Sequence, residues 1–442
     1  MTHSTAAYRE LVEKLFPRLT GGIRWGLERT EQLLHDAGDP HLRYRTIHVA
    51  GTNGKGSVAA TIASVLTQAG HRTGLYTSPH LCSFRERIRI NGLPISEDEL
   101  LAVASRRWPG IEASGASFFE ATTVLAFEAM AGANVDVAVV EVGLGGRLDS
   151  TNVIRPELGI ITNIAFDHAD YLGDTLTSIA TEKAGIIKSG VPLLTAETNQ
   201  EVLEVFRARA RVVGAPLYGF EPTAAGVVNA EGSRCALDTN SWGHIEVKSP
   251  LIGRHQLRNL QLAVAALDHL SAGFGIGADH VRQGTRAVRW PGRFQIVQAE
   301  GSTWVFDVAH NEAGVHALRE TFLLLELPKP TVLLIGILGD KDWERMLPPL
   351  FELGDQVVLS VPPTAPPNRA WNPDAVIART RPGHAIVERD FARALARVQE
   401  LATATGTILV TGSFHTVGDA QAILGWSEVE PDFPLPHKVF PG

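Results

Sequence analysis

Apolar and polar positions follow a strand–helix rhythm over most of this 442-residue chain. Short apolar runs predict strands at residues 46–50, 73–77, 135–142, 158–163 and 191–194. Helical patterns are expected to begin at Ser57, Ser96, Phe118, Leu176 and Glu201. Because buried strands that alternate with helices favour a mostly parallel sheet covered on both faces, the pattern predicts an α/β fold.

This rhythm is interrupted once and then resumes. Residues 216–250 are rich in Gly, Ser, Thr and Asn and predict a small β-rich excursion, after which Trp290–Arg293 ends a helical stretch. A second series follows, with strands expected at 303–308, 331–337, 356–359 and 407–411 and helices at 314–325, 343–350, 391–403 and 417–424. We therefore expect a first domain at 1–295, a smaller Rossmann-like α/β domain at 296–426, and an extended proline-rich tail at 427–442.

Composition narrows the class of protein. Hydrophobic residues make up 44% and charged residues 20% of the chain, which is typical of a globular protein. The net charge of −8 argues against nucleic-acid binding. Cys82 and Cys235 are the only cysteines, which suits a reducing compartment. With no secretory or membrane-spanning run, we expect a cytoplasmic protein without membrane partners.

The glycine-rich segment Gly51–Ser57 is the clearest chemical motif. It follows a predicted strand, precedes a predicted helix and contains Lys55. Glycines let backbone N–H groups turn toward an anion, and the lysine and the helix N-terminus add positive charge. The spacing differs from the usual P-loop, so the motif predicts nucleotide phosphate binding but not the common kinase or GTPase version.

Polar side chains also follow other predicted strands. Glu141 ends one strand, the loop 143–152 is rich in glycine and charge, and His168 follows the next strand. Ligands in open α/β sheets bind beyond the carboxyl ends of strands, where a carboxylate can hold the Mg²⁺ of a nucleotide. We therefore expect Glu141 and His168 at a metal or phosphate site, although each residue alone could be a structural hydrogen-bonding group.

Lys183 and Asp307 are ambiguous on sequence grounds. Lys183 stands at a predicted helix C-terminus, where a lysine suits the helix dipole. If it is desolvated instead, its amine could react with CO₂ and give a carbamate that positions Mg²⁺. Asp307 closes a strand of the second domain, as an acid that binds a ribose does. Asn259 and Arg293 carry no signal by themselves.

Taken in order, these segments resemble the folylpolyglutamate synthase/dihydrofolate synthase family of the Mur ligase superfamily. The resemblance runs from about residue 21 to 425. It rests on the stretches Gly51–Ser57, Tyr76–Leu81, Glu86–Ile88, Phe118–Glu120, Glu141–Asn152, Asp167–His168, Glu182–Ile186, Gly253–Gln256, Trp290–Phe294, Asp307–Asn311, Asp340–Asp342 and Thr411–Ser413.

The resemblance implies a P-loop central domain of the Mur ligase type and an ATP-dependent amide ligase. Asn53, Gly54, Lys55, Gly56 and Ser57 would bind the ATP phosphates. Ser57 and Ser78 would hold a first Mg²⁺ with Glu141, and His168 a second one with a carbamylated Lys183. From the linker and the second domain, Asn259, Arg293, Asp307 and His310 would complete the nucleotide site. Lys55, His168 and Lys183 would be the catalytic residues.

The substrates implied by the resemblance are ATP, L-glutamate and a folate or dihydropteroate. The pterin end would lie near Gly26, Leu27, Ser117, Leu148 and Asp149. The expected reaction adds glutamate to folates, and to dihydropteroate as well, through an acyl phosphate with release of ADP and phosphate, and we expect a monomer. Three alternatives stay open: another Mur-type amino-acid ligase that acts on cell-wall precursors, a P-loop kinase or NTPase, and a non-catalytic binding module.

Overall fold

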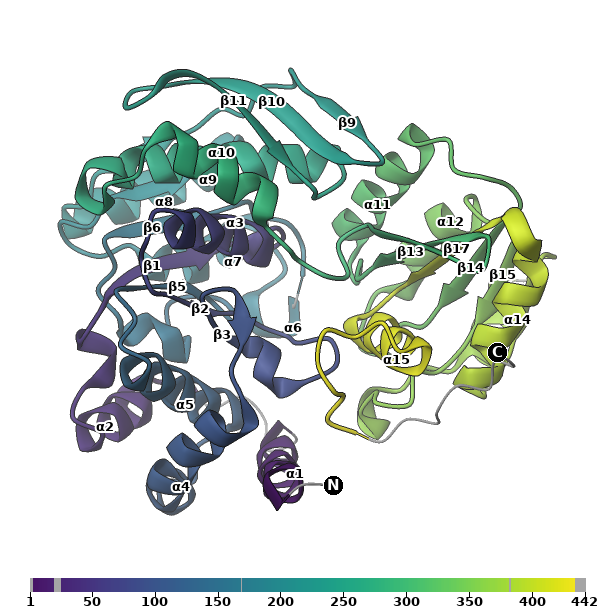
Figure 1. Ribbon diagram of the computed structural model, residues 1–442, viewed down its shortest axis with the longest axis horizontal. Helices are drawn as coiled ribbons and strands as arrows, with labels where there is room; N and C mark the ends of the chain where they lie inside the picture. The colour runs from purple at the N-terminus through teal and green to yellow at the C-terminus, as the bar shows by residue number, and fades with distance from the viewer. Residues whose placement is uncertain (1–2, 20–24, 168, 381–382, 434–442) are drawn as a thin grey trace.

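The computed structural model describes residues 3–19, 25–167, 169–380 and 383–433. Two α/β domains lie side by side, and a small antiparallel sheet covers the outer helices of the first (Figure 1). This arrangement confirms the predicted α/β fold with a mostly parallel sheet and a smaller second α/β domain. No helix among the described residues is long and apolar enough to cross a membrane.

The first domain is built on an eight-stranded sheet with the strand order β4-β3-β2-β5-β1-β6-β7-β8. The pairs from β2 to β8 are parallel, whereas β3 and β4 form an antiparallel edge. The strands are β1 Arg45–Ala50, β2 Thr73–Tyr76, β3 Ile88–Ile90, β4 Leu93–Pro94, β5 Val137–Glu141, β6 Leu158–Ile161, β7 Leu193–Thr195 and β8 Leu217–Gly219.

Helices cover both faces of this sheet, because its strands are apolar on both sides. One face packs on α3, α9 and α10, and the other on α1, α2, α4 and α5, while α7 and α8 lie over the β6–β7 side. The helices are α1 His3–Leu15, α2 Glu28–Asp36, α3 Lys55–Gln68, α4 Glu97–Ala113, α5 Phe118–Gly132, α6 Ala169–Leu172, α7 Leu176–Lys183, α8 Gln200–Val213, α9 Arg254–Phe274 and α10 Ala278–Ala287.

The predicted β-rich excursion is largely a separate three-stranded antiparallel sheet of β9 Val227–Asn229, β10 Gly232–Thr239 and β11 Gly243–Ser249. Its alternating inward side chains, such as Cys235 and Val247, pack against α9 and α10. The beginning of the excursion differs from the expectation, because β8 joins the main sheet through parallel pairing with β7.

The second domain contains a six-stranded sheet of order β12-β13-β17-β14-β15-β16, in which only β12 is antiparallel. Helices α11, α12 and α13 cover one face, and α14 and α15 cover the other. The strands are β12 Gln295–Ala299, β13 Ser302–Asp307, β14 Thr331–Ile335, β15 Gln356–Leu359, β16 Ala385–Val387 and β17 Thr407–Thr411; the helices are α11 Glu312–Leu324, α12 Trp343–Phe351, α13 Pro373–Thr380, α14 Phe391–Ala402 and α15 Phe414–Leu424.

Helix starts differ from the predictions where a cap or a glycine turn sets them. Helix α3 begins at Lys55 rather than at Ser57, because Gly54 takes a left-handed conformation with φ of 82° and ends the loop there. Helix α15 begins at Phe414 rather than at Val417, because the Ser413 hydroxyl accepts a hydrogen bond from the Thr416 amide. Both shifts place loop residues in the first helical turn.

Candidate active site

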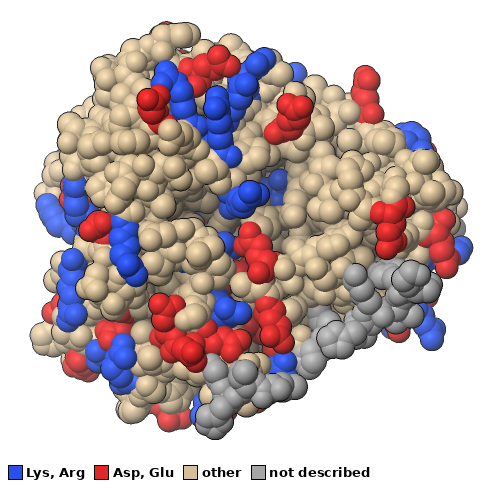
Figure 2. All heavy atoms as spheres, viewed as in Figure 1, with Lys and Arg blue, Asp and Glu red and all other residues tan. Residues whose placement is uncertain are grey.

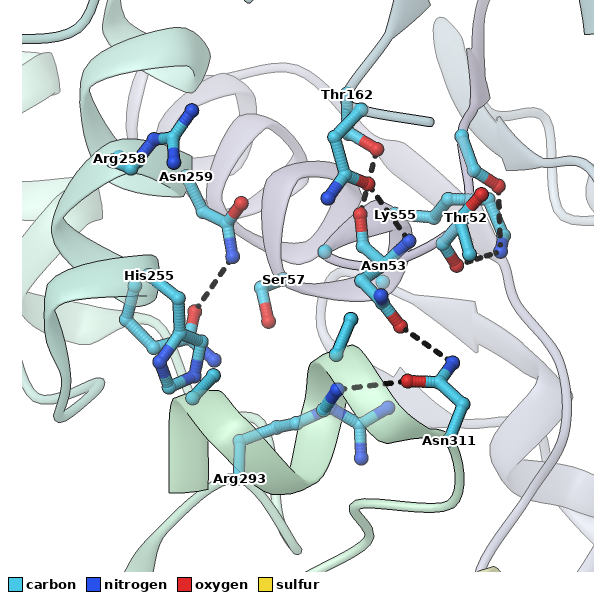
Figure 3. Close-up of a pocket in the computed structure, with 18 of the residues that line it drawn as sticks. Thr52, Asn53, Lys55, Ser57, Thr162, His255, Arg258, Asn259, Arg293 and Asn311 are labelled. Carbon is cyan, nitrogen blue, oxygen red and sulfur yellow. Dashed lines mark hydrogen bonds between the residues drawn. The ribbon is translucent and has the colours of Figure 1, made fainter. Parts of the chain in front are cut away.

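The phosphate loop connects β1 to α3 and is held by the neighbouring strand β6. Asn53 donates its backbone N–H to Asn163 Oδ1 at 2.9 Å, and Thr162 Oγ1 donates to the Asn53 carbonyl at 2.6 Å (Figure 3). Lys55 Nζ donates to the carbonyls of Gly51 at 3.1 Å and Thr52 at 3.0 Å. These hydrogen bonds hold the loop in one conformation and keep the Lys55 ammonium group against the loop carbonyls.

Two glycines of this loop allow close approach by residues from far along the chain. A Cβ on Gly54 would lie less than 3.0 Å from Asn259 Oδ1, and one on Gly56 would lie equally close to the indole of Trp290. Asn259 is itself oriented by donating to Gln256 Oε1 at 3.1 Å. The structure thus brings the predicted residue Asn259 directly onto the loop.

The three residues expected to hold the first Mg²⁺, Ser57, Ser78 and Glu141, line the same cavity. Ser57 lies in the first turn of α3, and its buried hydroxyl has no hydrogen-bond partner among the described residues. Glu141 ends β5 with 5% of its surface exposed, and its Oε2 accepts the Ser78 N–H at 3.1 Å. Burial raises the pKa of Glu141, and the nearby positive charge of Lys55 opposes that rise. A partnerless buried hydroxyl and a carboxylate that line the same cavity match the oxygen donors that Mg²⁺ prefers.

Lys183 lies at the C-terminal end of α7 and lines the same cavity, with 4% of its surface exposed. Burial, and then the positive charge of Lys55, lower its pKa from 10.5 to about 7. A large fraction of the amine is therefore uncharged near neutrality, which is the form that reacts with CO₂.

The predicted second metal site cannot be built from the described residues. His168 lies outside them. Within residues 3–19, 25–167, 169–380 and 383–433, no group of three or more His, Cys, Asp or Glu side chains could hold a metal ion. The second Mg²⁺ site and the role of His168 therefore stay predictions.

The second domain supplies the opposite wall. Arg293 follows the Trp290–Gly292 turn and lies over the Phe414 ring at 4.9 Å. Asp307, at the end of β13, accepts the N–H groups of Phe294 at 2.8 Å and Ala309 at 2.9 Å. Burial raises the pKa of Asp307, although Arg293 and these hydrogen bonds favour its ionised form. His310 donates from Nδ1 to the Val308 carbonyl at 2.9 Å, so its Nε2 remains for other contacts.

Asp167 links the two domains at the edge of this cavity, which the sequence pattern did not reveal. Its carboxylate accepts hydrogen bonds from Lys341 Nζ at 2.8 Å and from Asn311 Nδ2 at 3.0 Å, and His310 Nε2 lies 3.7 Å away. Asn311 Nδ2 also lies 3.1 Å from Asn53 Oδ1 (Figure 3). The Asp167–Lys341 pair is largely shielded from water, so it fixes how the phosphate loop faces the second domain.

These groups surround one cavity of about 740 Å³ between the domains. Figure 2 shows the surface hollowed there, with Lys and Arg side chains close to the hollow. Of the predicted residues, the cavity brings together Asn53, Gly54, Lys55, Gly56, Ser57, Ser78, Glu141, Lys183, Asn259, Arg293, Asp307 and His310. It also contains His255, which the pattern did not single out; burial lowers the pKa of this histidine to about 4.

The residues predicted for the pterin end do not line this cavity. Gly26 lines a separate hollow of about 590 Å³, and Leu27 precedes α2. Ser117 caps α5 in a capping box with Glu120. Leu148 is half-buried in the loop after β5, and the buried Asp149 carboxylate accepts hydrogen bonds from the amides of Gly143, Leu144 and Thr151. In this structure Asp149 holds its own loop in shape, and the pterin contacts stay predictions.

Comparison with known proteins agrees with this architecture. Residues 49–267 match the Mur ligase middle domain, and residues 292–414 match the domain described as Mur ligase, glutamate ligase domain. The dihydrofolate synthase/folylpolyglutamate synthase of Bacillus subtilis is 38% identical over 354 residues, which span 77% of this chain and 82% of that protein.

Solved structures extend the similarity to nearly the whole chain. The Mycobacterium tuberculosis folylpolyglutamate synthase complexed with ADP has a TM-score of 0.88 at 33% identity and covers 97% of this chain and 100% of its own. E. coli FolC in complex with DHPP and ADP has a TM-score of 0.79 at 30% identity, with 95% and 97% covered. The chain therefore belongs to the folylpolyglutamate synthase/dihydrofolate synthase family of ATP-dependent ligases.

Proposed function

We propose that this chain joins L-glutamate to the carboxylate of folates, and also to dihydropteroate, at the expense of ATP. The observation that carries the proposal is the single cavity that has the phosphate loop on one wall and Arg293, Asp307 and His310 on the other. A relative of 30% identity was solved with DHPP and ADP together, which supports a site that holds an acceptor and a nucleotide at the same time.

The proposed chemistry has two steps. An oxygen of the folate carboxylate attacks the γ-phosphorus of ATP, the bond to ADP breaks, and an acyl phosphate forms. The uncharged amine of glutamate then attacks the acyl carbon, the amide forms, the nitrogen loses a proton, and inorganic phosphate leaves. Activation is required because a free carboxylate repels nucleophiles and has no adequate leaving group.

Positive charge at the loop would support the first step. Loop N–H groups and the start of α3 would face the phosphates, and Lys55 would exchange its two carbonyl partners for phosphate oxygens. Ser57, Ser78 and Glu141 would hold Mg²⁺. When bound, this ion neutralises phosphate charge as two anions approach one another. The buried hydroxyl of Ser57 and the raised pKa of Glu141 fit residues whose partner is a cation.

Lys183 would act in its carbamylated form. Its neutral amine adds to CO₂, giving an N-carboxylate and a proton, so that an uncharged buried group becomes an anion whose charge is opposed by Lys55. A pKa of about 7 makes the amine available for this addition at neutral pH. The anion would help His168 to hold the second Mg²⁺.

Arg293, Asp307 and His310 would bind the nucleotide from the opposite wall, and Asn259 would bind it beside the phosphate loop. We propose that closure of the two domains around ATP excludes water from the acyl phosphate. The Asp167–Lys341 pair and Asn311 would guide that closure. Gly26, Leu27, Ser117, Leu148 and Asp149 would shape the pterin end. Small-angle scattering that showed no compaction with ATP and folate together would contradict closure.

The decisive test is ADP release from ATP with dihydropteroate or tetrahydrofolate as acceptor, each with and without glutamate. The ligase requires both acceptor and glutamate, and product mass increases by one glutamyl residue. ADP release without either substrate would indicate an NTPase, and a stable phosphorylated acceptor a kinase. Turnover only with cell-wall precursors would assign the chain to another Mur-type activity.

A further inference from the structure

The described tail, residues 427–433, follows the second domain but ends on the first. Helix α15 packs within the second domain, and Trp426 lies edge-on to Trp304 and Phe306 at 5.4 and 5.8 Å. Beyond this anchor the chain turns back toward the first domain (Figure 1). Glu428 Oε2 accepts a hydrogen bond from Arg89 Nη2 at 2.8 Å on that domain. The tail is therefore a second bridge between the domains after the linker near Trp290: it continues from the second domain and is held on the first by hydrogen bonds.

Asp432 is the buried end of this crossing. Only 4% of its surface is exposed, and its carboxylate accepts hydrogen bonds from Tyr8 Oη at 2.6 Å, Ser83 Oγ at 2.8 Å and the Phe84 N–H at 2.7 Å. Its own N–H donates to the Cys82 carbonyl at 3.1 Å. A carboxylate is taken out of water only where several donors replace the lost hydration, so this contact is specific.

Three of these partners belong to one loop, residues Ser78–Arg87, which we name the clamp loop. Its other end carries Ser78, whose N–H contacts Glu141 in the active-site cavity. Between the two ends, Glu86 accepts the N–H groups of Leu81 at 2.9 Å, Cys82 at 2.9 Å and Ser83 at 2.8 Å. The loop is thus tied together from Leu81 to Glu86, and Arg87 Nε donates to His80 Nδ1 at 2.8 Å closer to Ser78.

The clamp loop is also pressed against the second domain. Cys82 Sγ donates to the Gly418 carbonyl of α15 at 3.3 Å, and a Cβ on Gly418 would lie less than 3.0 Å from the Leu81 carbonyl oxygen. The tail contacts the same loop through Asp432. The loop is consequently contacted both by α15 and by the segment that continues from α15.

We propose that the tail is a positioning element for the active site, in which Asp432 fixes the clamp loop and thereby couples the position of the second domain to Ser78 beside Glu141. Asp432 is a positioning residue and touches no substrate. That the positioned group serves nucleotide and Mg²⁺ binding rests on the proposed function above. The physical coupling between the tail and the clamp loop does not.

Hydrogen–deuterium exchange of the free protein tests the coupling directly. The amides of Ser78, Leu81, Cys82, Ser83 and Phe84 all donate to carboxylates in this assembly, so their exchange reports its integrity. In Asp432→Ala we expect the peptide covering 78–87 to exchange at least tenfold faster, while the α5 peptide and the sheet of the second domain keep wild-type rates.

Two further variants control this experiment. Glu430→Ala removes a charge from the same tail. Glu430 is exposed, and its ion pair with Arg9, at 3.8 Å, is weak, so the 78–87 peptide should keep its wild-type exchange rate. Tyr8→Phe removes one of the three donors to Asp432 and should give a smaller acceleration in the same peptide. Unchanged exchange at 78–87 in Asp432→Ala, or equal acceleration throughout both domains, would overturn the proposal.

Calorimetric titration with ADP, with and without Mg²⁺, tests the link to the site. We expect Asp432→Ala to lower the Mg²⁺-dependent part of ADP affinity severalfold and to leave the Mg²⁺-free affinity unchanged. Retention of the full Mg²⁺ effect would remove the link to Ser78. Hydrogen–deuterium exchange does not depend on turnover. Absence of ligase activity would therefore refute the proposed function, whereas the coupling between the tail and the clamp loop would still be tested by the exchange rate of the 78–87 peptide.

Discussion

Replacing Gly54 by alanine is expected to damage nucleotide binding more than folding, and the structure supplies a matched control. Gly54 has a φ of +82°, and Gly92, in the turn between β3 and β4, has a φ of +81°. A Cβ on Gly92 meets nothing within 4 Å, whereas one on Gly54 would collide with Asn259 Oδ1. The two variants therefore share the backbone strain and differ only in the collision.

The magnitudes follow from these contacts. A left-handed conformation costs an L-residue roughly 1–2 kcal/mol, and Gly92→Ala should lose that stability alone. Gly54→Ala must also displace Asn259 from Gln256, which adds about 1 kcal/mol for one hydrogen bond. Because the loop amides and Asn259 both face the nucleotide site, we expect ADP affinity to fall at least about tenfold, or about 1.4 kcal/mol.

Urea unfolding and calorimetric ADP titration of both variants measure the two effects separately. Gly92→Ala should keep wild-type ADP affinity despite its lost stability. The reasoning fails if Gly54→Ala binds ADP like the wild type, because the collision with Asn259 would then have no consequence. It fails equally if Gly92→Ala weakens ADP binding to the same extent, because backbone strain alone would explain the loss.

Three other predictions concern buried charge. Lys183→Met should abolish turnover. Between pH 7 and 10.5 the unfolded wild type binds a proton that the folded state does not, so the stability of the wild type rises with pH. In CO₂-free buffer the stability advantage of the variant in urea unfolding should therefore shrink from about 4 kcal/mol at pH 7 to about 2 kcal/mol at pH 9, and an equal advantage at both pH values would contradict this reasoning. Glu141→Gln should make the nucleotide-free protein at least as stable as the wild type, because a desolvated carboxylate is lost. In calorimetry, Mg²⁺ should no longer strengthen the binding of an ATP analogue to this variant, and an intact Mg²⁺ effect would exclude Glu141 as a metal ligand. Lys341→Met should cost roughly 3 kcal/mol in urea unfolding, because it breaks a buried ion pair by removing the ammonium group 2.8 Å from Asp167. Arg345→Met breaks only exposed ion pairs and should cost less than about 1 kcal/mol; equal losses would show that burial of the Asp167 pair adds nothing to its contribution.

Much of the fold could be read from local pattern. Strands β1, β2, β5, β6, β7, β13, β14, β15 and β17 lie within two residues of their predicted positions, because short apolar runs bounded by turn residues are typical of buried strands. Strands β3, β4, β12 and β16 and helices α6 and α13 were not predicted. Strands β12 and β16 contain no fully buried residue, and α13 has only two, so their sequences carry little apolar periodicity.

The site residues also differ in whether local sequence could predict them. Gly51–Ser57 and Glu141 were predicted because the chemistry depends on neighbours in sequence or on the end of a strand. Asp167 was not chosen as a site residue, because its importance arises from Lys341, which is 174 positions away. His168 was predicted and lies outside the described residues, so it remains a prediction.

The sequence by itself determined the strand–helix alternation, the phosphate-binding loop and the family, because each is encoded in short-range spacing and in the order of motifs. The tertiary structure alone decided which distant side chains share one cavity, that burial lowers the pKa of Lys183 to about 7, and that the tail returns to the first domain. Desolvation and charge interactions depend on distance and burial in three dimensions, and neither quantity can be read from position along a chain.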